Sequence, residues 1–130
     1  MRRAFTLMEL LLVVVIIGVM AGFAIPNYGK TTRRMRARDA TTALTMISGG
    51  NVVYKARTGS NLSASPLSAI NTALSLNIVA NQATYECGAT ANICTATSSA
   101  GASDFKVSVD LTADISSTNP SCTTSNSSCP

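Results

Sequence analysis

Cysteine is the residue type in this 130-residue chain whose chemistry is easiest to predict. The chain has four cysteines and no histidine, which excludes the usual Cys/His zinc patterns. The six-residue gaps that separate Cys87 from Cys94 and Cys122 from Cys129 are wider than those of a typical four-cysteine zinc site. An even cysteine count in a small domain outside the cytoplasm favours two disulfides. Three connectivities are possible, and the short loops favour Cys87–Cys94 and Cys122–Cys129.

A carboxylate inside an apolar segment is the second chemical signal. Residues 5–25 are almost wholly apolar and carry one charge, Glu9. A helix of this length spans roughly 30 Å, the hydrocarbon thickness of a bilayer. An acidic group near a bilayer centre costs about 2.5–3.5 kcal/mol, although it costs less near the boundary. We therefore expect Glu9 to have a partner and a function.

This segment has two simpler interpretations. A secretory signal peptide has a shorter apolar region followed by a small-x-small cleavage site, and residues 21–26 match such a site poorly. A plain membrane anchor, held with its N-terminus in the cytoplasm by Arg2 and Arg3, gains nothing from Glu9. Glu9 therefore argues against a plain membrane anchor.

The charge distribution and the residue types exclude several other functions. Nine of the ten basic residues lie in residues 1–57, whereas residues 58–130 have a net charge of −3. This asymmetry suits a protein that stands on a membrane or packs into an ordered array, and no specific nucleic-acid binding is predicted. The chain has no histidine for a triad and no glycine-rich phosphate loop after a strand. We expect neither an enzyme nor a metal or other cofactor.

Helical periodicity continues beyond residue 25. Pro26 lacks a backbone donor, so we expect a kink or local opening of the helix there, which Gly18 and Gly22 favour by lowering helix propensity. From residue 27 to about residue 57 the chain can continue as an amphipathic helix. The predicted apolar face of this half contains Ala40, Leu44 and Ile47.

The rest of the chain predicts short strands. Alternation of apolar and polar residues is clearest in residues 105–112, and weaker strands are predicted at 83–87 and 93–97. A short helix is expected at about residues 67–76. The predicted fold class is α+β: a long N-terminal helix, with an apolar and an amphipathic half, packs against a small antiparallel sheet. A head of this size has a marginal core, which two disulfides would supplement.

The string Phe5-Thr6-Leu7-Met8-Glu9 follows a short basic leader and precedes Gly18 and Pro26. This pattern resembles the N-terminal signature of type IV pilins and of the related type II secretion pseudopilins. The resemblance covers residues 1–57, and beyond them only the general pattern of the head fits. The family usually has glycine immediately before the scissile bond, where this chain has Ala4. Alanine is nearest to glycine in size, so we expect cleavage to be retained.

The resemblance implies a role for each matching residue. A prepilin peptidase would cut between Ala4 and Phe5 and methylate the new amine of Phe5. Glu9 would become the fifth mature residue and face the Phe5 amine of a neighbouring subunit. In a low-dielectric bundle these charges attract strongly, and the pair would set the register between subunits rather than add much stability. The implied organisation is a leader at residues 1–4, a transmembrane or filament-core half-helix at 5–29 and a head at 30–130.

The function predicted on this basis is a structural subunit of a type IV pilus. Its partners would be copies of itself in a helical filament, the inner membrane, the prepilin peptidase and the pilus assembly machinery. The precursor would reside in the inner membrane and the mature subunit in an extracellular filament. The alternative is a pseudopilin of a type II secretion or DNA-uptake machine, although two cysteine pairs favour a pilus. A bitopic membrane protein with a periplasmic binding head is a third interpretation, which Glu9 disfavours.

Overall fold

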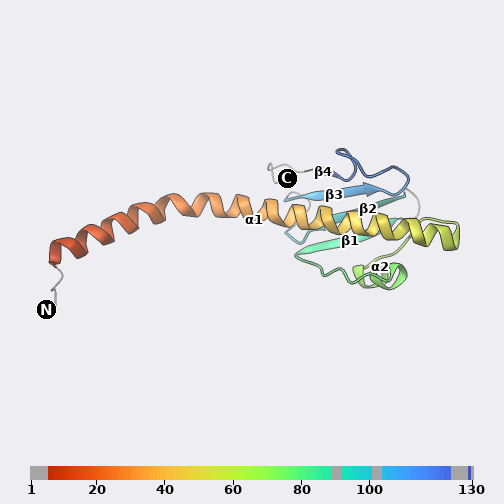
Figure 1. Ribbon diagram of the computed structural model, residues 1–130, viewed down its shortest axis with the longest axis horizontal. Helices are drawn as coiled ribbons and strands as arrows, with labels where there is room; N and C mark the ends of the chain where they lie inside the picture. The colour runs from red at the N-terminus through yellow and green to blue at the C-terminus, as the bar shows by residue number, and fades with distance from the viewer. Residues whose placement is uncertain (1–5, 89–91, 101–103, 124–128, 130) are drawn as a thin grey trace. The chain divides into compact units, whose positions relative to one another are not determined.

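The computed structural model describes residues 6–88, 92–100, 104–123 and 129, and within residues 23–27 it describes the backbone alone. The chain divides into two compact units, Met1–Thr32 and Arg33–Pro130. Helix α1 (Leu7–Thr58) begins in the first unit and ends in the second. The other described elements belong to the second unit (Figure 1): α2 (Leu67–Leu74), β1 (Ala83–Gly88), β2 (Ile93–Ser98), β3 (Lys106–Asp110) and β4 (Ser121–Thr123).

The first unit consists of the N-terminal part of α1. The helical assignment is continuous through Gly18, Gly22 and Pro26, and the kink or local opening expected at these residues stays a prediction. Across the described part of the chain, none of the helices combines the length and apolarity needed to cross a bilayer.

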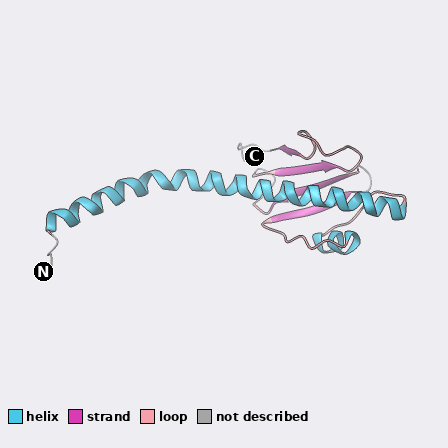
Figure 2. Cartoon of the chain, viewed as in Figure 1, coloured by secondary structure: helices cyan, strands magenta, loops and turns pink. Residues whose placement is uncertain are grey.

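The second unit is a sheet with helices packed against it, as Figure 2 shows. Its four strands are antiparallel and follow chain order, β1–β2–β3–β4. The register pairs Cys87 with Cys94, Cys94 with Val109 and Val107 with Cys122. The predicted α+β class, with a long helix on a small antiparallel sheet, is therefore confirmed.

One cluster of buried residues joins the second-unit part of α1 to the sheet. Apolar side chains that recur every three or four residues along α1 form one side of it, as the helical period requires. Alternate side chains of the strands form the other side, as the strand period requires. The helix contributes Ala37, Ala40, Ala43, Leu44 and Ile47, and the sheet side includes Tyr85, Ala96, Phe105, Val107 and Val109. The predicted apolar face of the helix is confirmed.

The strand bounds differ from expectation at the C-terminal end of the sheet. Alternation predicted a strand over residues 105–112, but β3 ends at Asp110. The Asp110 carboxylate accepts hydrogen bonds from the Thr112 backbone N–H at 2.8 Å and from its hydroxyl at 2.6 Å, which turns the chain away from the sheet. Strand β4 was not predicted, because its three residues offer no apolar alternation.

Two adjacent glycines of α1 have different surroundings. A Cβ at Gly50 would lie 3.3 Å from the Leu74 Cβ and from its Cδ1, so Leu74 would have to move by a few tenths of an ångström to admit it. A Cβ at Gly49 would have no atom within 4 Å. Glycine in a helix interior costs roughly 0.5–1 kcal/mol relative to alanine. Packing within the chain therefore favours glycine at position 50 and does not account for glycine at position 49.

We expect Gly49→Ala to stabilise the second unit by about 0.5–1 kcal/mol, because it adds helix propensity without a clash. We expect Gly50→Ala to be less stable than Gly49→Ala by about 1 kcal/mol, because Leu74 must move to admit the methyl group. Urea unfolding of both full-length variants measures the difference. Equal stability of the two variants would contradict the close approach of α2.

Candidate functional site

The N-terminal part of α1 carries an exposed apolar surface. Large apolar side chains between Leu7 and Met20 are exposed by 46% at Val13 to 87% at Leu7. Glu9 is exposed as well and is the one ionisable residue from Leu7 to Gly22. Burying a side chain such as Leu or Val stabilises by roughly 1.5–3 kcal/mol, so this surface strongly favours any arrangement that covers it. We call residues 7–22 the apolar segment.

The apolar segment begins at a helix cap. The Thr6 hydroxyl accepts a hydrogen bond from the Glu9 backbone N–H at 3.3 Å, which satisfies one of the free donors of the first helical turn. Thr6 and Glu9 have the Thr-x-x-Glu spacing of a capping box, and a carboxylate in the first turn also interacts favourably with the helix dipole. The cap uses the backbone N–H of Glu9, and the sequence analysis overlooked it, although the Thr-x-x-Glu spacing was there to indicate it.

Some of the predicted site residues cannot be placed. Ala4 and Phe5, the residues of the expected cleavage site, lie outside the described residues. The side chain of Pro26 is also outside the description, whereas Gly18 and Gly22 lie on α1 with open space around them. The proposed pair between Glu9 and a Phe5 amine thus stays a prediction.

Both predicted disulfides are present. Cys87–Cys94 joins register partners on β1 and β2, whose Cα atoms are 4.0 Å apart. Cys122–Cys129 closes the chain that follows β4, with a Cα–Cα distance of 5.8 Å. The described part of the chain contains no free cysteine. The pairing that the short loops favoured is confirmed.

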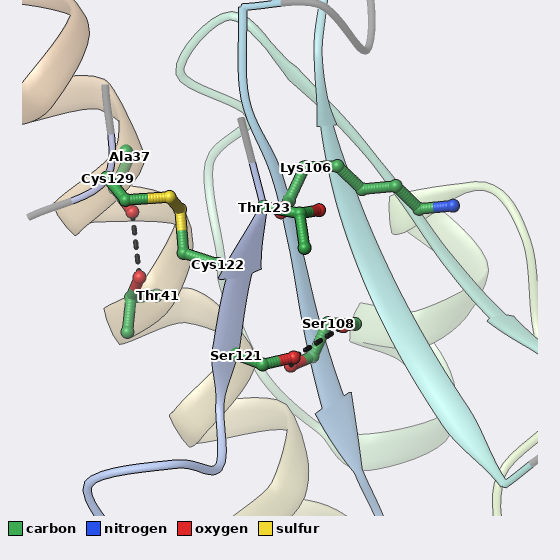
Figure 3. The surroundings of a disulfide bond; sticks show 8 residues. All are labelled: Ala37, Thr41, Lys106, Ser108, Ser121, Cys122, Thr123 and Cys129. Carbon is green, nitrogen blue, oxygen red and sulfur yellow. Dashed lines mark hydrogen bonds between the residues drawn. A yellow bond between two sulfur atoms is a disulfide. The ribbon is translucent and has the colours of Figure 1, made fainter. Parts of the chain in front are cut away.

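The second disulfide lies beside α1. Thr41 of α1 lines the same hollow as Cys122 and Cys129, and Figure 3 shows Cys122 on β4. Cys122 is half-buried and packs against the core, and β4 is also held to β3 through the Ser121 and Ser108 hydroxyls, 2.9 Å apart. This C-terminal region has few apolar side chains. Covalent and polar contacts therefore secure a segment that hydrophobic burial alone cannot hold.

An ion pair connects α1 to the loop that precedes β3. Arg33 Nε lies 3.3 Å from Asp104 Oδ1, and the Ser98 hydroxyl donates to Asp104 Oδ2 at 3.0 Å. The Asp104 side chain is 9% exposed, whereas that of Arg33 is 51% exposed. A nearly buried carboxylate requires such partners, because desolvation penalises an unpaired charge. The loop before β3 directs the Asp104 carboxylate towards α1 and Ser98.

Three asparagines connect segments that are far apart in the sequence. Buried Asn51 on α1 accepts a hydrogen bond from the Leu62 backbone N–H at 2.8 Å and donates to Asn61 Oδ1 at 3.1 Å. Asn61 in turn donates to Asn92 Oδ1 at 2.8 Å. These bonds attach the loop after α1 to the helix and to the start of β2. Amide side chains suit this task because each can donate and accept at once.

A fourth asparagine organises the loop between β3 and β4. Asn119 Oδ1 accepts from the Asp110 backbone N–H at 2.9 Å. Its Nδ2 donates to the backbone carbonyls of Asp110, Ala113 and Asp114 at 3.0, 3.1 and 3.3 Å. One buried side chain thus bonds four backbone groups, two at the end of β3 and two in the loop that follows it.

Two titratable groups of the second unit have shifted pKa values, and both shifts have structural causes. Burial raises the pKa of Tyr85, and the nearby negative charge of Asp39 raises it further. Hydrogen bonds from the hydroxyl and the backbone N–H of Thr112 lower the pKa of Asp110. The described residues contain no group of three or more His, Cys, Asp or Glu side chains placed to hold a metal ion.

Comparison of the chain with protein-family models, with curated proteins and with solved structures found no match. The class of protein that the fold defines is an α+β protein with a disulfide-bonded head and an exposed apolar helix.

We predict that the two disulfides each contribute about 2–3 kcal/mol, because each closes a short loop and restricts the unfolded chain. Replacing both members of one pair by serine, in separate variants, should lower the free energy of unfolding by this amount. Urea unfolding of full-length protein measures it. A variant as stable as the parent would show that its disulfide plays no part in stability.

We predict that Asp104→Asn destabilises the second unit by about 1–3 kcal/mol, because it removes the charge that pairs with Arg33. Asp114→Asn is the matched control, since it makes the same chemical change at an exposed side chain. Chemical denaturation at neutral pH compares the two variants. Similar free energies of unfolding for both would mean that the ion pair is not a structural contact.

Proposed function

We propose that this chain is a structural subunit of a type IV pilus. The observation that carries the proposal is the apolar segment, whose exposed side chains cover α1 from Leu7 to Met20 and are interrupted by one carboxylate, Glu9. A surface of this size requires a cover in water. Copies of the same segment provide one when they bundle, and the heads then lie on the outside of the filament.

The proposed assembly contact is a charge pair between copies. Removal of residues 1–4 leaves a positive amine on Phe5, immediately before the Thr6 cap. This amine precedes the N-terminal end of α1, where the helix dipole is also positive. A nearby carboxylate would therefore stabilise it. The Glu9 side chain of a neighbouring copy supplies that carboxylate inside an apolar bundle. The pair sets the axial register, because a displaced neighbour leaves both charges unpaired.

The disulfides are consistent with export of the head. Stable disulfides form outside the reducing cytoplasm, and both pairs lie in the second unit. We propose that the precursor is held at the inner membrane, is cut and methylated by a prepilin peptidase, and is then taken up by the pilus assembly machinery. The mature subunit ends in an extracellular filament.

The direct test is electron microscopy of filaments sheared from cells, with mass spectrometry of their subunit. We expect filaments made of this chain, beginning at Phe5 with an N-methyl group and lacking residues 1–4. Ala4→Gly should be processed at least as fast. Intact Met1 on surface filaments would contradict the processing, and the absence of this chain from any filament would contradict the function.

Glu9 variants test the register pair. Glu9→Gln keeps the hydrogen-bonding groups of a capping box but removes the charge, so we expect an intact helix and few filaments. Glu9→Ala should give the same assembly defect. Thr6→Ala is the control, because it removes the cap, worth about 1 kcal/mol, and keeps the carboxylate. Counts of filaments per cell, with each variant as the sole subunit, measure assembly. Abundant, ordered filaments from Glu9→Gln would exclude Glu9 as the register element.

A further inference from the structure

The second unit begins with a cluster of arginines on α1. Four arginines lie within six successive positions, Arg33, Arg34, Arg36 and Arg38, and Asp39 is the acidic residue next to them in the sequence. We call these four arginines the basic collar. Arg33, Arg34 and Arg38 are exposed and Arg36 is half-buried. Their charge is not explained by the core, which α1 forms with its apolar side chains.

Ion pairing within the chain neutralises little of this charge. In the described part of the chain, the ion pair found at the basic collar is Arg33 with Asp104. Arg33 stays half exposed in that pair, so its remaining guanidinium donors can reach another anion. The pair also ties the start of the basic collar to the loop before β3. The arginines are therefore held at the margin of a folded head and retain a net positive charge.

The directions of the arginines restrict the shape of an anionic partner. Successive residues of a helix are rotated by about 100°, so Arg34, Arg38 and Arg36 lie about 100°, 140° and 300° around α1 from Arg33. A rod-shaped polyanion such as duplex DNA lies along one side of a helix and meets part of this set. The sheet covers α1 at Ala37 and Ala40, and a layer of phosphates can approach the helix from each of the sides left uncovered, where all four arginines keep some exposure.

We infer that the basic collar binds the anionic headgroups of a phospholipid surface. The same helix carries the apolar segment before the basic collar, and basic residues beside an apolar helix are the pattern that anionic bilayer surfaces attract. Arginine matches phosphate through two parallel N–H bonds, which favours it over a simple point charge. The binding holds the subunit beside the membrane before assembly, so in the cell it acts upstream of the proposed filament.

The test is flotation of the purified full-length chain with vesicles of phosphatidylcholine, with and without phosphatidylglycerol. The apolar segment can bind both kinds of vesicle, so the measured quantity is the gain in affinity that phosphatidylglycerol adds. Arg34→Gln with Arg38→Gln removes two exposed charges that the Asp104 pair does not use. We expect this double variant to reduce the gain by roughly ten- to thirty-fold, from about 1 kcal/mol per basic residue near an anionic surface.

The matched control is Lys55→Gln with Arg57→Gln, which makes the same charge change in the last turn of α1. We expect this control to keep the gain in affinity that phosphatidylglycerol adds. An equal loss in both double variants would mean that net charge alone causes the effect, and it would overturn the proposal. Duplex DNA or inorganic phosphate, each added at constant ionic strength, should leave the gain unchanged. If either one abolishes it, the arginines bind a nucleic acid or free phosphate, and the lipid assignment is wrong. Because flotation needs no filament, its outcome is independent of the pilus test.

Discussion

The packing of one face of α1 onto the sheet is the interaction on which the rest of the second unit depends. The strands are short, β4 has three residues, and a sheet of this size needs a partner layer to be stable in water. Leu44 and Ile47 supply that layer with no exposed surface. The close approach of α2 at Gly50 and the Asp104 pair at Arg33 both depend on the position that this packing gives α1.

Polar and covalent contacts extend the order to segments that hydrophobic burial cannot hold. The loop after α1 is attached through Asn51, the loop between β3 and β4 through Asn119, and the C-terminal region through Cys122–Cys129. Each of these segments is rich in Ser, Thr and Asn. A small domain buries too little apolar area to order such segments through hydrophobic burial alone. Specific hydrogen bonds and disulfides therefore order them.

The two units differ in whether the apolar side chains of α1 are buried or exposed. In the second unit, α1 places its apolar side chains on one face, and the sheet covers them. In the first unit, apolar side chains point in every direction and remain exposed from Leu7 to Met20. A helix that is apolar all round requires surroundings that cover it on all sides. The proposed filament follows from that requirement, because other copies of the chain would cover the segment.

The sequence by itself determined the features that depend on local periodicity or short spacing. The helical face of Ala40, Leu44 and Ile47, the α+β class and both disulfide pairs were predictable, because each depends on residues close together in the chain. The Thr6 cap could have been predicted in the same way. Only the tertiary structure decided β4, the Arg33–Asp104 pair and the Asn51 contacts. Their partners are distant in sequence, and a polar side chain carries no periodic signal of which distant backbone group or charge it will meet once the core has formed.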